Sequence, residues 1–508
     1  MGKTTLTLMI ITILSKISGL IRDMTFSYAY GTDIIKDIYI ISESVATIAF
    51  SFLFMSIQST FIPVYSKIKS EHGRKAADRF TSNLTNILLI IAIVVLVLAI
   101  IFMRPILSIV AKGFQGEALE QAITFTRINI FSILFMAINA CMISYLNIYN
   151  NFTIPATTGI FMNIILISSA FLSLKFKNPM ILAYGAVLSS SAKYFLFPSA
   201  LRKTGYRHKL IVKPKDPHLI DSLQIAIPMM FSIIVNDFSI IIDKTIATTV
   251  VREGGVSSLD YAYKILQLID GIVIVSIITV VYPKMSQLVQ AGKIKSYKKL
   301  TNSSMVSCLL LVIPATVGLM LFVDPIVSII YERGAFSETS HMLTTGALFW
   351  YAPCLIASVF LNFLNRSFYS LGDTKTPLII AGVQVLFDIV LNIVLSKLMG
   401  LNGLAFSTTI GNFIASFLLI YLLKKKVGRF HLRQMSQSIL KISIATLIMA
   451  LLSYSLYRYL PITSMIARFL LALIIAILSY FICILFMQIP EVKRVINQIY
   501  HKYKRRRA

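Results

Sequence analysis

Apolar segments of about twenty residues recur along this chain from its N-terminus almost to its end. A helix needs about 20 apolar residues to cross the hydrocarbon core of a bilayer, and so many segments do not fit around one soluble core. Hydrophobic residues make up 57% of the sequence and charged residues only 14%. We therefore predict an all-α polytopic membrane protein with about fourteen transmembrane helices. The expected spans are 5–29, 36–63, 83–111, 119–146, 153–174, 179–201, 219–250, 258–283, 301–330, 341–370, 376–397, 402–424, 436–458 and 463–488.

The basic residues are concentrated in alternate loops between these spans, and the net charge is +27. Because Lys and Arg are retained on the cytoplasmic side, this alternation predicts that both termini are cytoplasmic. The same charges predict contact with anionic membrane lipids, most simply through the tail Lys502–Arg507, and they argue against nucleic-acid binding. The clusters are Lys67–Arg79, Arg202–Lys215, Lys284–Lys299, Lys424–Arg433 and Lys493–Arg507.

Cysteine and histidine give no sign of catalysis. The four cysteines lie singly in apolar segments, and the six histidines are scattered. Their spacing matches neither a metal site nor a disulfide framework, so we predict that the protein is not an enzyme and needs no cofactor. The first apolar stretch contains Lys16, Arg22 and Asp23, and no small-residue cleavage site follows it. We therefore expect a retained first span and no signal peptide.

The two halves of the chain repeat each other. Arg104–Val110 (RPILSIV) matches Asp324–Ile330 (DPIVSII), and Pro63 and Pro283, each at the end of a span, share the same spacing. An even number of spans per half returns the chain to the same side of the membrane, so the repeats are parallel. Two such lobes with a substrate site between them form a known transporter plan, which predicts alternating access.

The repeat and the longest polar connection predict a division into lobes. A six-span N-lobe is followed by a basic cytoplasmic linker, a six-span C-lobe, and two further spans with a basic cytoplasmic tail. The corresponding ranges are 1–201, 202–218, 219–426 and 427–508.

Four motifs carry a resemblance to a known family. They are Ser15–Asp23 (SKISGLIRD), Thr60–Val64 (TFIPV), Tyr331–Phe336 (YERGAF) and Phe368–Pro377 (FYSLGDTKTP). Together with the two-lobe layout, they resemble the MurJ (MviN) lipid II flippases of the multidrug/oligosaccharidyl-lipid/polysaccharide exporter superfamily. The resemblance implies a bacterial inner-membrane protein of peptidoglycan and cell-wall biogenesis. It would move an undecaprenyl-pyrophosphate-linked precursor from the inner to the outer leaflet, with other cell-wall synthesis proteins as candidate partners.

Three basic residues lie inside predicted spans, where a charge is costly and usually faces a cavity or a partner. Lys16 and Arg22 are in the first span, and Lys264 is in the eighth. A pyrophosphate needs positive charge and N–H donors, and Arg offers a bidentate fork that Lys lacks. These three positions resemble cavity-lining arginines of the family, which implies substrate binding. A further arginine of the family aligns with Phe50, so we expect a less basic cavity here.

Nearby acidic residues leave a structural alternative open for these cations. An intramembrane ion pair would serve the fold rather than the substrate. The alternative partners are Asp23 or Asp37 for Arg22, and Asp260 or Asp270 for Lys264. Asp37 is also a candidate for a gate or for the start of a helix. The acidic residues assigned to gating or to structural charge are Asp23, Asp37 and Glu43.

Polar residues of three later spans form a possible cation site. Carboxylate, amide, hydroxyl and backbone carbonyl oxygens are the ligands that hard cations prefer, and two close carboxylates need a cation or a proton. In the family these positions resemble a sodium site, with one Asp/Asn pair exchanged. The competing readings are proton coupling and ordinary hydrogen bonding between helices. The residues are Asp243, Asp388, Asn392, Leu404 and Thr408.

Other functions stay open at this point. A flippase for another polyprenyl-linked glycan, such as a capsule or teichoic-type precursor, is favoured by Phe50, whereas the motifs at Tyr331 and Phe368 favour lipid II. A multidrug/cation antiporter would need an acidic, aromatic cavity, but the central charges here are basic. A membrane scaffold that transports nothing would not need charges inside its spans.

Overall fold

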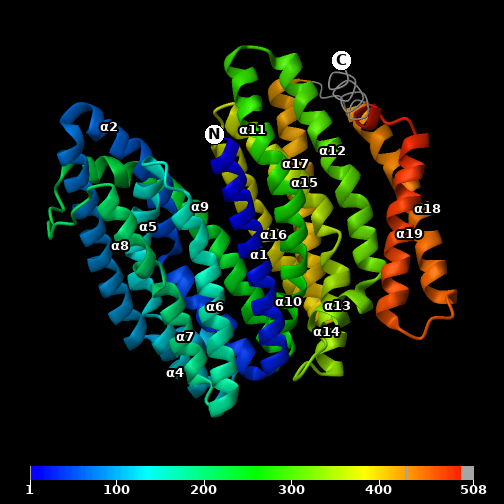
Figure 1. The fold of residues 1–508 in the computed structure, drawn as a ribbon, viewed down its shortest axis with the longest axis horizontal. Helices are drawn as coiled ribbons and strands as arrows, with labels where there is room; N and C mark the ends of the chain where they lie inside the picture. Colours follow the sequence, from blue (N-terminus) through cyan, green and yellow to red (C-terminus); the bar gives the residue numbers. More distant parts are fainter. Residues whose placement is uncertain (1, 429–431, 494–508) are drawn as a thin grey trace. The chain divides into compact units, whose positions relative to one another are not determined.

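The computed structural model describes residues 2–428 and 432–493, which form helices with no strand in those two ranges (Figure 1). Ten helices of the described residues are long and apolar enough to cross a membrane, or up to twelve if each of two bent pairs is one span. This confirms the predicted all-α, multi-pass membrane protein. The count is consistent with about fourteen spans for two reasons. The helix Gly2–Tyr30 is not among those counted, and the helix Ile34–Ile101, which covers most of two predicted spans, is counted once. The tail Lys502–Arg507 lies outside the described residues.

Contacts divide the chain into two compact units, of which the first comprises Met1–Ser257 and Arg333–Ser340. Its helices are α1 (Gly2–Tyr30), α2 (Ile34–Ile101), α3 (Met103–Val110), α4 (Glu117–Asn129), α5 (Ser132–Ile148), α6 (Thr153–Phe176), α7 (Met180–Ser191), α8 (Lys193–Lys203) and α9 (Pro217–Val250).

Helix α2 contains the predicted span 36–63 and most of the predicted span 83–111, whose end forms α3. Its 68 residues would extend about 100 Å if straight, several times the hydrocarbon thickness of a bilayer. The backbone leaves helical geometry at Gly73, where φ is 78°, a value that glycine adopts without steric cost. The spans predicted at 36–63 and 83–111 therefore lie on opposite sides of this break, and the basic segment Lys67–Arg79 surrounds it.

The second unit comprises Ser258–Glu332 and His341–Ala508. One of its spans is interrupted by a π-helical turn, and another bends by 44° at a break that contains Pro353, which has no N–H to continue the helical ladder. Its helices are α10 (Gly255–Ile269), η1 (Asp270–Ile274), α11 (Val275–Gln290), α12 (Ile294–Leu321), α13 (Val323–Tyr331), α14 (Glu338–Tyr351), α15 (Cys354–Ser370), α16 (Lys375–Met399), α17 (Leu401–Val427), α18 (Leu432–Tyr459) and α19 (Met465–Phe486).

Two segments group differently from the predicted lobes. Helix α9 has its contacts in the first unit, although the repeat places it at the start of the C-lobe. The segment Arg333–Ser340 also belongs to the first unit, where Ala335 N donates to Tyr28 O at 2.9 Å and the Thr32 and Ser340 hydroxyls are 2.8 Å apart. The lobe division drawn from the repeat stays a prediction.

Candidate functional site

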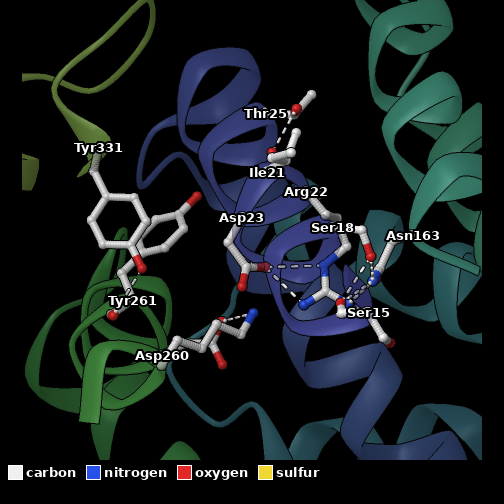
Figure 2. Close-up of polar contacts among 11 residues, drawn as sticks. Ser15, Ser18, Ile21, Arg22, Asp23, Thr25, Asn163, Asp260, Tyr261 and Tyr331 are labelled. Carbon is white, nitrogen blue, oxygen red and sulfur yellow. Dashed lines mark hydrogen bonds and ion pairs between the residues drawn. The ribbon is translucent and has the colours of Figure 1, made fainter. Parts of the chain in front are cut away.

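Arg22 lies in the middle of a polar network within the first unit (Figure 2). Its Nε and Nη2 donate to Asp23 Oδ1 at 3.0 and 2.8 Å, and its Nη1 donates to Asn163 Oδ1 at 3.2 Å. These bonds use three of the five N–H donors of a guanidinium. The Arg22 side chain is 22% exposed and that of Asp23 only 8%, so the cation can still be reached while its acidic partner is buried.

Asn163 on α6 connects this network to the backbone of α1. Its Nδ2 donates to Ser18 Oγ at 2.9 Å and to Ser15 O at 3.3 Å. A Cβ on Gly159, one turn earlier on α6, would overlap the Ser15 hydroxyl, so the two helices are in close contact here. The sequence analysis did not find Asn163, although an amide within the apolar span 153–174 was a signal for it.

Arg22 forms its ion pair with Asp23, one of the two acidic partners considered for it. Asp37 instead holds the start of α10. Its Oδ1 accepts from Ser257 N at 2.7 Å and its Oδ2 accepts from Gly254 N at 2.8 Å, and the side chain is fully buried. A carboxylate at this position satisfies backbone N–H groups that a helix N-terminus leaves without intrahelical partners. Asp37, itself in the first turn of α2, thus holds the start of a different helix, and its assignment to gating or structural charge stays a prediction.

The other residues of the first unit that the sequence analysis singled out differ in burial. Lys16 is partly buried on α1, Glu43 is exposed on α2, and Phe50 is fully buried on α2. Phe50 therefore packs inside protein. Asp243 lies on α9, also in the first unit, and is partly buried.

Lys264 lies on α10 in the second unit, next to an acidic partner. Its Nζ is 2.8 Å from Asp260 Oδ2, one turn earlier, and the two side chains are 22% and 23% exposed. The neighbouring Tyr261 packs on Tyr331, with ring centroids 4.7 Å apart, and its carbonyl accepts from the Tyr331 hydroxyl at 3.2 Å (Figure 2). The structure thus shows the Asp260 pair that the sequence raised as an alternative for Lys264.

Four of the five candidate cation ligands lie on α16 and α17 of the second unit. Ser407 donates one hydrogen bond to Asn392 Oδ1, and its hydroxyl also contacts Leu404 O at 2.8 Å. Thr408 Oγ1 donates to the same Leu404 carbonyl at 3.1 Å. The network therefore brings together an amide oxygen, two hydroxyls and a backbone carbonyl, which are the oxygen types that hard cations prefer.

Asp388 lies one turn before Asn392 on α16 and is buried. Gly411, one turn after Ser407 on α17, faces its carboxylate, and a Cβ there would overlap Asp388 Oδ1. The two helices are thus matched in register: Asp388 meets Gly411 and Asn392 meets Ser407. Neither Ser407 nor Gly411 was predicted, although both follow Leu404 at helical spacing.

The fold belongs to a known structural class. A solved structure described as the inward-facing conformation of a multidrug resistance MATE family transporter of the MOP superfamily matches with a TM-score of 0.64. The match covers 80% of this chain and 98% of that chain at 16% identity, so the likeness is one of fold. The chain has the fold of this superfamily.

Within that class, the family is also defined. The chain matches the family described as "Lipid II flippase MurJ" over residues 26–485 and belongs to it. A solved "Lipid II flippase MurJ, inward closed conformation" matches with a TM-score of 0.82 and 27% identity, over 94% of this chain and 97% of that chain. The "Probable lipid II flippase MurJ" of Buchnera aphidicola subsp. Baizongia pistaciae is 27% identical over 89% of each chain. The resemblance drawn from the four motifs is confirmed.

Proposed function

We propose that this protein is a lipid II flippase, which moves the undecaprenyl-pyrophosphate-linked peptidoglycan precursor from the inner to the outer leaflet. Membership of the MurJ family supports this proposal directly. The observation that carries it within the molecule is Arg22, a guanidinium inside an apolar span with N–H donors left for a ligand. A charge at that depth is expensive to keep and is usually tied to transport.

The headgroup role follows from the chemistry of the three cations. Lys16, Arg22 and Lys264 each contact the pyrophosphate at some stage of the transport cycle. Arg22 provides a planar fork, whereas the lysines act as point charges. Asp23 and Asn163 hold the guanidinium in one orientation, which reduces the entropy lost when the substrate binds.

The proposed orientation follows from the basic loops. Both termini are in the cytoplasm, and the protein lies in the bacterial cytoplasmic membrane, where its basic loops contact anionic lipids. Other cell-wall synthesis proteins are proposed partners.

We further propose that a cation drives the cycle. Asp388, Asn392, Leu404 and Thr408 supply oxygen ligands of the type that Na⁺ takes, and Asp243 stays the fifth residue of the set that was proposed from the sequence. The register of α16 against α17 supports this choice, because it places oxygen-bearing side chains of both helices on one shared face.

A second candidate function has one observation in its favour. Phe50 is fully buried where the family pattern has an arginine, so one cation for the headgroup is missing. A substrate with a different polar part, such as a capsule or teichoic-type lipid-linked precursor, would tolerate that loss.

Complementation of a strain depleted of its lipid II flippase, combined with leaflet-specific labelling of the precursor, tests both functions. Wild-type protein should restore growth and outer-leaflet lipid II. Arg22→Ala should abolish both while its level in the membrane stays normal, and Arg22→Lys should retain part of the activity. Full activity of Arg22→Ala would remove the headgroup role. Failure of well-expressed wild-type protein to restore labelling would favour the second candidate.

A further inference from the structure

The first unit contains a cavity of about 300 Å³ between α2, α5 and α8. Tyr206 and His208, in the connection that follows α8, also line it. The volume is at the lower end of the range for small-molecule sites in proteins. None of the residues proposed for the headgroup or the cation lines this cavity, so its function would be separate from theirs.

Two buried polar groups in the cavity wall have no hydrogen-bond partner among the described residues. They are Asn139 Oδ1 on α5 and the Tyr194 hydroxyl on α8. Asn139 is only 1% exposed. The Tyr194 ring packs edge-on against Phe135, one turn before Asn139 on α5, with centroids 5.5 Å apart. This contact brings the Tyr194 ring beside the turn of α5 that carries Asn139. Both groups line the same cavity, and leaving them unpaired costs free energy.

A second amide in the wall, Asn86, has all its hydrogen-bonding groups paired within the protein. Asn86 Nδ2 donates to Lys209 O and Ile211 O, both at 2.9 Å, and its Oδ1 is 2.8 Å from His208 Nε2. Asn86 thus attaches the connection that follows α8 to helix α2. Because Asn86 is satisfied by protein, the unmet hydrogen-bonding groups among the described lining residues are Asn139 Oδ1 and the Tyr194 hydroxyl.

The opposite end of the cavity is exposed and basic. Arg202, in the last turn of α8, lines the cavity and is exposed. It lies eight residues after Tyr194 on the same helix, a separation of about 12 Å along the axis. Apolar side chains line the wall, among them Leu89, Met142 and Phe197. A ligand would therefore meet a cation first, then an apolar wall, and last two hydrogen-bonding groups.

We propose that this cavity binds a medium-chain amphipathic anion that carries a hydroxyl at its far end. The acidic group pairs with Arg202, and the chain contacts the apolar wall. The terminal hydroxyl donates to Asn139 Oδ1 and accepts from the Tyr194 hydroxyl. A ten-carbon ω-hydroxy acid has about the required length, since Tyr194 and Arg202 are about 12 Å apart along α8.

Thermal stability of the full-length protein in nanodiscs of zwitterionic lipid tests this proposal. The probes are 10-hydroxydecanoate, decanoate, which lacks the hydroxyl, and 1,10-decanediol, which lacks the charge. A ligand that binds the folded state raises the melting temperature, and the rise saturates with concentration. We expect half-saturation by 10-hydroxydecanoate at a concentration at least about tenfold lower than by either control, because a site built for a hydroxyl rejects the analogue without it.

Variants assign the contacts to residues. Asn139→Leu and Tyr194→Phe should each remove the preference for 10-hydroxydecanoate over decanoate, and Tyr194→Phe changes the shape of the wall very little. Arg202→Ala should remove the preference over the diol. Arg207→Ala, a neighbouring exposed arginine outside the cavity lining, is the matched control and should change neither preference.

The proposal is overturned if 10-hydroxydecanoate gives no saturable shift, as expected if ordered water alone satisfies Asn139 and Tyr194. It is also overturned if decanoate binds equally well, or if Tyr194→Phe and Asn139→Leu keep the wild-type preference. Because the readout is binding, these outcomes do not depend on whether the protein transports lipid II.

Discussion

Asn163 Oδ1 accepts a hydrogen bond from Arg22 Nη1 at 3.2 Å, which links α6 to the guanidinium of α1. The amide of the same residue donates to Ser18 Oγ and Ser15 O, so one side chain fixes both the helix that carries Arg22 and the direction in which its guanidinium points. Asn163 is thus a positioning residue for the proposed headgroup contact.

We predict that Asn163→Leu, a substitution of similar size, lowers the rate of outer-leaflet lipid II labelling by at least about tenfold, the factor that corresponds to about 1.4 kcal/mol. Loss of the amide leaves Arg22 charged but held by Asp23 alone, so its guanidinium is less well oriented for the substrate. Asn163→Asp keeps the acceptor and should retain more activity than Asn163→Leu. Asn362→Leu on α15, where the amide bonds within its own helix to Ser358 O, is the control. Equal activity of Asn163→Leu and wild type, at equal membrane levels, would show that Arg22 needs no support from α6.

A second prediction concerns Asp37 and the start of α10. Asp37→Ala removes the acceptor of two backbone N–H groups, each of which costs about 1–3 kcal/mol when buried without a partner. The melting temperature of Asp37→Ala should fall markedly below that of wild type. The melting temperature of Asp37→Asn, which keeps one acceptor oxygen, should fall less. Asp33→Asn, an exposed aspartate one turn earlier, is the control and should melt like wild type. An unchanged melting temperature for Asp37→Ala would mean that water replaces the carboxylate.

The all-helical, multi-pass architecture could be predicted from the sequence because the length of an apolar segment determines whether it can span a bilayer. The expected count of about fourteen spans is consistent with the structure. The continuation of α2 through Lys67–Arg79 could not be predicted from the sequence. A basic stretch between two spans is typical of a loop, and its helical geometry depends on packing. Charged candidates such as Arg22 and Asp388 stood out because charge inside a span is rare.

Their partners were harder to find. Asn163 is 141 residues from Arg22, and the contact of Gly411 with Asp388 depends on how α16 and α17 pack. A glycine has no side chain whose chemistry would indicate a contact, and an amide inside a span does not indicate which residue it bonds to. The unpaired groups of Asn139 and Tyr194 are likewise visible only when the helices around them are assembled.

A third prediction concerns pH and the motif Phe368–Pro377. Burial opposes ionisation of Asp373, but hydrogen bonds from Lys426 and from Thr376 outweigh it and lower the pKa of that carboxyl to about 2. Lys426 Nζ is 2.5 Å from Asp373 Oδ2, and Thr376 N and Oγ1 donate at 3.0 and 2.8 Å. Because the folded pKa lies below the unfolded value of about 3.9, the carboxylate stabilises the fold above about pH 4.

That stabilisation is lost as pH falls through about 2. Asp373→Asn should therefore melt below wild type at pH 6, and the difference should shrink as pH falls from about 4 toward 2. Asp221→Asn, at an exposed aspartate on α9, is the control. A difference between wild type and Asp373→Asn that is constant across the pH series would show that the carboxylate charge does not contribute.

The last prediction concerns coupling. If Asp243, Asp388, Asn392 and Thr408 bind Na⁺, sodium should raise the melting temperature of the purified protein with saturation, because a ligand of the folded state stabilises it by mass action. Potassium and choline at matched ionic strength should not. Asp388→Asn keeps an oxygen but loses a charge, so it should weaken the effect, and Asp243→Ala should eliminate it.

The glycine that faces Asp388 provides a variant that removes no ligand oxygen. In Gly411→Ala the added methyl would overlap the Asp388 carboxylate and displace it, whereas a Cβ on Gly382 of α16 meets no atom within 4 Å. Sodium should therefore fail to stabilise Gly411→Ala but should stabilise Gly382→Ala as it does wild type. A proton-coupled protein would instead show stabilisation that follows pH and ignores sodium. If wild type and Asp243→Ala melt identically across sodium and pH series, neither ion is coupled here, and the α16–α17 network serves only to join the two helices.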